Sequence, residues 1–185
     1  VTQPVISVTG VGKVREDRLV STAGAKPGQD ILVTKWIGIE GTSIIAKEKE
    51  KELLERFSQA FVDTAKGFDQ YLSVLPDSRI AVEHGVSAMH EVTEGGIYGA
   101  LWEGAEASGS GLEIDLKAIP IRQEPIEICE YFELNPYYLI SSGCMLMAAD
   151  QGHDLVRKLE AAGIPAAVIG KATDGKARRI WNGGE

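Results

Sequence analysis

One short stretch of the chain, residues 89–99, combines side chains that can bind and activate a substrate. An imidazole can donate to a phosphate or substrate oxygen, and a carboxylate can act as a base or bind a metal ion. A threonine can cap a helix, a glycine pair lets a backbone or a ligand approach closely, and a helix start favours an anion. These features define a candidate substrate- or phosphate-binding site made of His90, Glu91, Thr93, Gly95 and Gly96.

Each candidate also has an ordinary structural interpretation, because short motifs often occur without binding anything. His90 can be a hydrogen-bonded structural histidine in a strand-to-helix turn, and Glu91 can cap or pair locally. His84 and His153 are expected to be surface or turn residues. No catalytic residue is assigned, and no ligand spacing points to a metal site.

The candidate site needs a strand before it and a helix after it. The apolar run 80–82 predicts a short strand, and the pattern over 93–107 predicts an amphipathic helix with Thr93 at its N-cap. Upstream, residues 31–37 indicate a buried strand, and 40–74 indicate one or two helices with a break near Ser58 or Gly67. The charge run 47–56 is typical of a solvated helix face.

The remaining segments alternate between strand and helix patterns. Strands are predicted at 112–116 and 144–149, and helices at 126–132 and after a capping Asp150. A final hairpin is predicted from 166–170 and 177–181 around Asp174-Gly175, and two short strands within the first 22 residues. Seven or eight strands and four or five helices predict an α/β (α+β) fold with a mixed sheet flanked by helices.

Composition narrows the function classes. The chain has 185 residues and a net charge of -8, which argues against nucleic-acid or anionic-membrane binding. No apolar run is long enough for a membrane helix, and no signal peptide is visible. The two cysteines, Cys129 and Cys144, lie in apolar contexts without a CxxC, so we expect reduced core residues of a cytoplasmic protein.

Four stretches in register resemble the C-terminal domain of the aminoimidazole ribonucleotide (AIR) synthase superfamily, in particular its HypE hydrogenase-maturation branch. They match the family patterns AKPGD, AMHDPTRGG, GIEID…IPV and CELLGLDPLYL. In this sequence they are residues 25–33, 88–96, 111–115 with 119–121, and 129–136 with 138–139.

The resemblance implies that the chain is one half of a longer protein. Residues 1–22 would be the tail of a missing N-terminal half, and 23–185 the AIR synthase-related C-terminal domain. The full-length protein is then expected to be a homodimer that binds ATP and Mg²⁺ and activates an amide by dehydrating a carbamoyl group. A maturation protein is a possible partner, and the isolated domain, without cofactor of its own, is expected to be inactive.

The sequence departs from the family pattern at several positions. Glu91 replaces the family Asp, Glu94 replaces the family Arg, and the residues at 38–41 and 141–144 differ from the family turns. The printed chain also ends in Glu185 instead of the cysteine that carries the carbamoyl group. The alternative is therefore a divergent, non-catalytic module that binds a metabolite or a maturation partner.

Overall fold

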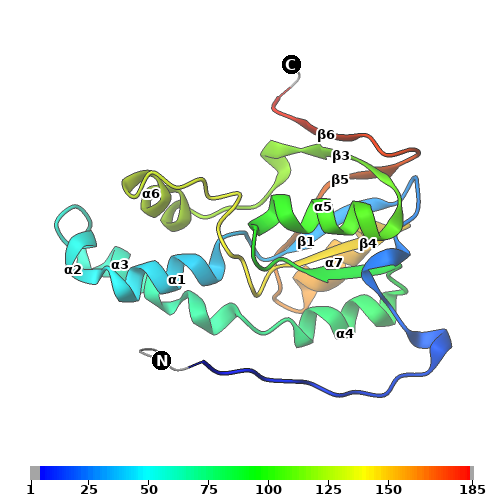
Figure 1. The fold of residues 1–185 in the computed structure, drawn as a ribbon, viewed down its shortest axis with the longest axis horizontal. Helices are drawn as coiled ribbons and strands as arrows, with labels where there is room; N and C mark the ends of the chain where they lie inside the picture. The colour runs from blue at the N-terminus through cyan, green and yellow to red at the C-terminus, as the bar shows by residue number, and fades with distance from the viewer. Residues whose placement is uncertain (1–4, 184–185) are drawn as a thin grey trace.

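The computed structural model describes residues 5–183 and contains one six-stranded mixed sheet (Figure 1). The strand order is β2-β4-β1-β5-β3-β6, with every neighbouring pair antiparallel except β3 and β6. The central strands β1 and β4 are buried along their whole length. The strands are β1 Asp30–Thr34, β2 Ala88–Glu91, β3 Gly111–Asp115, β4 Met145–Ala149, β5 Ala166–Thr173 and β6 Arg178–Trp181.

Helices cover both faces of this sheet. On β1, Ile31 and Val33 pack in the cluster that includes α5, whereas Leu32 packs with α4 and α7 on the other face. The helices are α1 Ile39–Glu48, α2 Glu50–Leu53, α3 Gln59–Lys66, α4 Leu75–His84, α5 Gly96–Ser108, α6 Gln123–Tyr131 and α7 Gly152–Ala161. Short 3₁₀ turns occupy Glu16–Arg18, Thr22–Gly24, Gly67–Tyr71 and Leu116–Ala118. The predicted α/β class is confirmed.

The strand predicted at 80–82 is wrong, because these residues lie inside α4. Pro76 stands in the first turn of this helix, where its missing N–H costs nothing, and Gly85 ends it in the left-handed conformation. Three apolar residues fit either a strand or a helix, and the flanking Pro and Gly settle the choice. The strand that leads into the candidate site is β2 instead.

The predicted C-terminal hairpin is also wrong. Both edges of β5 are occupied, by β1 on one side and β3 on the other. The chain after Gly175 therefore cannot return beside β5, and β6 adds to the outer edge of β3 as a parallel strand, with Ile180 opposite Ile114.

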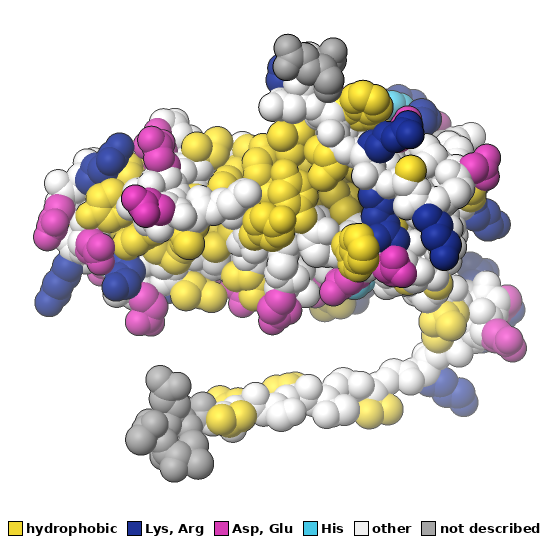
Figure 2. Space-filling model, turned by 45° about the horizontal axis from the view of Figure 1, so that its top comes forward, with side chains coloured by type: hydrophobic (Ala, Val, Ile, Leu, Met, Phe, Trp, Pro, Cys, Tyr) yellow, Lys and Arg dark blue, Asp and Glu magenta, His cyan; other side chains and the backbone are white. Residues whose placement is uncertain are grey.

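The N-terminal segment does not form the predicted pair of strands within the described part, residues 5–22; residues 1–4 lie outside it. Residues 5–24 form an N-terminal arm, of which residues 5–15 are extended, have no secondary structure and stand apart from the body (Figure 2). The side chains of Val5, Val8 and Val11 are exposed. The arm is anchored at the Thr22–Gly24 turn, which packs against α5 and β2.

Smaller predictions differ in detail. The structure has six strands and seven α-helices over residues 5–183, fewer strands and more helices than predicted. The number of helices is higher because the segment 40–74 divides into several short helices. One of them, α3, begins after Ser58, whose hydroxyl caps it. Asp150 does not cap α7; instead, Asp30 of β1 accepts a hydrogen bond from the N–H of Gly152, at 3.0 Å. The charge run near α2 is largely exposed, as predicted.

Candidate functional site

The candidate residues lie in the turn between β2 and α5. Thr93 is not the N-cap of the helix, which is Gly95, and no side chain caps this end. Gly95 and Gly96 both have positive φ, 81° and 61°. Two consecutive left-handed residues suit only glycine, and they turn the chain before the hydroxyl of Thr93 can reach the first helical N–H groups. The backbone oxygen of Thr93 accepts from Gly96 instead, at 3.1 Å.

The close approach permitted by the glycines is made by another part of the chain. A Cβ on Gly96 would lie 2.4 Å from the carbonyl oxygen of Tyr137 and 2.8 Å from that of Leu139. The same Tyr137 oxygen accepts from the N–H of Tyr98, at 3.4 Å. In this structure a backbone segment therefore covers the start of α5, where an anion was expected to bind.

His90 makes contacts with both ring nitrogens. Its Nε2 lies 2.6 Å from Oε2 of Glu103, and its Nδ1 lies 3.1 Å from the hydroxyl of Thr22. An ionised carboxylate can only accept, so Nε2 donates to Glu103. The hydroxyl of Thr22 lies between Nδ1 and the carbonyl oxygen of Met89, at 3.4 Å from the latter. The histidine thus links the arm, β2 and the middle of α5, and neither nitrogen is free while these contacts hold.

Glu91 belongs to a different environment from its neighbour. Successive strand residues point to opposite sides, and Glu91 Oε1 accepts from the N–H of Gly143, at 3.1 Å. The structure therefore brings Glu91 next to the turn 141–144, and does not bring it together with the His90 ring in one pocket. The assignment of these residues to a binding site stays a prediction.

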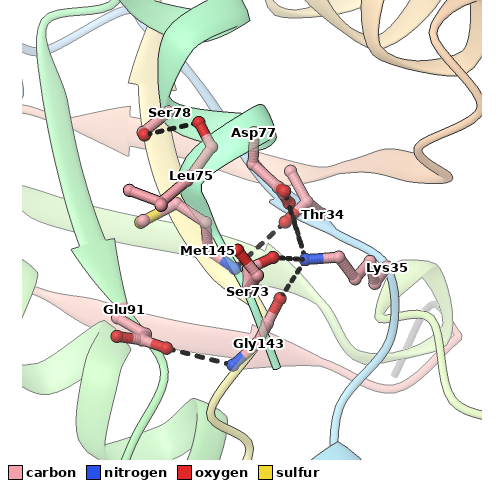
Figure 3. Close-up of polar contacts among 9 residues, drawn as sticks. All are labelled: Thr34, Lys35, Ser73, Leu75, Asp77, Ser78, Glu91, Gly143 and Met145. Carbon is pink, nitrogen blue, oxygen red and sulfur yellow. Dashed lines mark hydrogen bonds and ion pairs between the residues drawn. The ribbon is translucent and has the colours of Figure 1, made fainter. Parts of the chain in front are cut away.

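The turn at Gly143 is also held from its other side (Figure 3). Its carbonyl oxygen accepts from Nζ of Lys35, at 2.6 Å, and the same ammonium contacts both carboxylate oxygens of Asp77, at 3.0 and 3.2 Å, and the carbonyl of Ser73, at 3.1 Å. The side chains of Lys35 and Asp77 are only 8% and 1% exposed. Lys35 also has a left-handed backbone, φ 57°.

Sequence reasoning missed this buried pair. Lys35 and Asp77 are 42 positions apart, so no local periodicity connects them. The one available signal was a lysine at the end of a buried strand, since lysine is almost never fully buried without a partner.

The cysteines are free and buried, as predicted. Burial raises the pKa of the Cys144 thiol to about 12, with Lys35 lowering it slightly and Asp77 and Glu91 raising it. Burial alone raises the pKa of Cys129 to about 11. Both thiols stay protonated near neutral pH, which makes them poor nucleophiles.

The other histidines lie where they were expected. His153 is exposed at the start of α7, and Nε2 of His84 lies 3.3 Å from the carbonyl oxygen of Gln151. Over residues 5–183, no group of three or more His, Cys, Asp or Glu side chains could hold a metal ion. Within the same range no helix is long and apolar enough to cross a membrane.

Residues 26–182 match the family model of the AIR synthase related protein, C-terminal domain. The chain belongs to this family. It is 32% identical over 169 residues to the carbamoyl dehydratase HypE of Cupriavidus necator, covering 85% of this chain and 46% of the relative. A putative hydrogenase expression/formation protein of Methanocaldococcus jannaschii is 30% identical over 174 residues, 91% of this chain and 49% of the relative.

Solved structures share the fold. The crystal structure of Escherichia coli HypE superposes with a TM-score of 0.70 at 21% identity, over 87% of this chain and 48% of that one. The thiamine monophosphate kinase of Aquifex aeolicus gives 0.62 at 18% identity, over 87% and 52%. This family member therefore spans about half the length of the relatives that it matches, and the family resemblance seen in its motifs is confirmed.

Proposed function

We propose that this family member is the C-terminal domain, residues 23–185, of a longer HypE-like protein. Residues 1–22 would be the tail of a preceding half. The observation that carries the proposal is the match to HypE carbamoyl dehydratases, which covers most of this chain but less than half of each relative. The extended arm supports it, because its valine side chains lie exposed and have no strand partner among residues 5–183.

The whole protein, as a dimer, would activate an amide with ATP and Mg²⁺, in the manner of carbamoyl dehydration. This domain does not fit these groups by itself. The segment 137–139 covers the start of α5, and the described residues offer no cluster of metal ligands. The preceding half would therefore hold the phosphates and the metal. This domain would contribute one wall, in which Glu91 and the Lys35–Asp77 pair fix the turn at Gly143.

The test compares the full-length protein with the isolated chain. ATP hydrolysis is measured for both, with and without a partner that presents a carbamoylated cysteine. We expect turnover by the full-length protein and none by the isolated chain. Turnover by the isolated chain at the same rate would contradict the assignment to half a site. Glu91→Ala in the full-length protein removes the acceptor of the Gly143 N–H and should lower the rate, whereas Glu48→Ala, at the exposed end of α1, should not.

A second function is favoured by the closed start of α5 and by Glu94 at the position of the family Arg. A divergent, non-catalytic module would bind a metabolite or a maturation partner instead of ATP. A crystal structure of a HypE–HypF complex is known, and the matched chain of that structure shares this fold at 19% identity with a TM-score of 0.66. Calorimetric titration of the full-length protein with ATP separates the two proposals, since only the enzyme should bind the nucleotide.

The two free, buried thiols support a reducing compartment, and we place the protein in the cytoplasm. Fractionation of the cells that produce the protein, followed by immunodetection, would test this placement, because recovery outside the cytoplasmic fraction would contradict it.

A further inference from the structure

The strand β6 forms one end of the sheet and has a strand neighbour, β3, on one side only over residues 5–183. Two of its apolar side chains are exposed, Ile180 by 45% and Trp181 by 44%. A groove of about 270 Å³ runs beside it; its lining includes Tyr98, Trp102, Leu112, Ile114, Tyr138 and Ile180. Figure 2 shows a broad hydrophobic area on the face viewed there, with basic side chains along one margin.

Edge strands usually avoid pairing with other chains by projecting charges outward. At β6, one of the two arginines, Arg178, is instead held against its own chain. The guanidinium of Arg178 lies 3.9 Å from the ring centre of Trp102 and pairs with Glu106. The side chain of Arg179 is 62% exposed, and its charge is offset by Glu113 on β3, whose Oε1 lies 3.5 Å away. The usual protection of an edge is therefore weakened at β6.

We propose that β6 pairs antiparallel with β6 of a second copy of this chain. Such a pair has a two-fold axis perpendicular to the sheet, so each residue faces a residue on the same face of the sheet. Because side chains alternate between faces, one residue must face its own copy, and the axis passes midway between these two residues. The residue that faces its own copy is the centre of the pair, and only Arg179 and Ile180 lie in the middle of this four-residue strand.

Chemistry selects between the two centres. A pair centred on Arg179 would place two like charges directly opposite each other, which is unfavourable. A pair centred on Ile180 places Ile180 opposite its own copy and Arg179 opposite Trp181, twice. An apolar pair flanked by two arginine–tryptophan pairs is self-complementary. Because the axis is perpendicular to the sheet, the face that α5 covers lies on the same side in both copies. The two grooves beside Ile180 therefore join.

This contact is independent of the proposed function, because it uses only the outer edge of the sheet. It is tested by sedimentation equilibrium of the chain over a range of concentrations. The wild type should form a dimer. Ile180→Asp should raise the dimer dissociation constant by about tenfold or more, since it places two carboxylates opposite each other. Ile44→Asp on α1, at a residue of similar exposure (48%), is the matched control and should dimerise like the wild type.

A wild type that stays monomeric at every concentration, or an Ile180→Asp variant that dimerises as well as the wild type, would overturn the proposal. Cysteine cross-linking then tests the register. Ile180→Cys should form a disulfide-linked dimer in air, whereas Arg179→Cys should not, because it faces Trp181. The native Cys129 and Cys144 are buried and do not compete. Efficient cross-linking of Arg179→Cys with none at position 180 would refute the register, and circular dichroism verifies that each variant is folded.

Discussion

Replacement of Lys35 by methionine should destabilise the domain strongly. The ammonium makes two contacts with Asp77, at 3.0 and 3.2 Å, and donates to the carbonyls of Ser73 and Gly143. Methionine has a similar length but no charge, so the Asp77 carboxylate, 1% exposed, is left buried without its partner. Breaking a buried ion pair from one side costs about 3–5 kcal/mol of unfolding free energy. The left-handed backbone at position 35 remains in the variant and offers no compensation.

The assay is urea denaturation followed by far-UV circular dichroism. The double variant Lys35→Met/Asp77→Leu removes both charges, and it should recover most of the loss because apolar replacements of buried pairs are often neutral. Lys49→Met serves as the control, since Lys49 pairs with Glu52 on the surface and its loss should have no measurable effect. A Lys35→Met variant less than about 1 kcal/mol weaker than the wild type would refute the reasoning, as would a double variant no more stable than the single one.

Three further predictions use the same denaturation assay or thiol chemistry. Gly96→Ala should cost about 2 kcal/mol or more, because its Cβ meets the Tyr137 carbonyl; Gly175→Ala, also at positive φ but in open space, should cost less. Cys144 and Cys129 should react with a thiol reagent near pH 8 only after denaturation, and rapid labelling of the native protein would contradict their burial. Burial raises the pKa of Cys144 to about 12 in the folded protein, so the thiol of the unfolded chain ionises first as pH rises. The free energy of unfolding should therefore fall above about pH 9, by up to about 1.4 kcal/mol per pH unit for this group. The fall should be less steep in Cys144→Ala.

The local structure around the candidate site was predicted only in part. The strand-to-helix turn with a glycine pair could be read from the sequence, because two glycines before an amphipathic pattern indicate a close approach. What approaches could not be read, because the segment 137–139 lies some 40 positions further along the chain. The roles of His90 and Glu91 were left open for the same reason. Their partners, Glu103 and Gly143, depend on which face of β2 each side chain points to.

The sequence by itself determined the family and those elements whose patterns are local. The strand β1 is a continuous apolar run, β3 alternates apolar and polar residues, and α5 repeats its apolar residues at helical spacing. Each of these patterns is defined by a few neighbouring residues. Tertiary structure alone decided which elements meet. Strand β6 joins β3 because both edges of β5 are already occupied, and Lys35 is buried only because Asp77 reaches it from α4. Pairing of edges and compensation of buried charge act between distant segments, and periodicity within one segment carries no record of them.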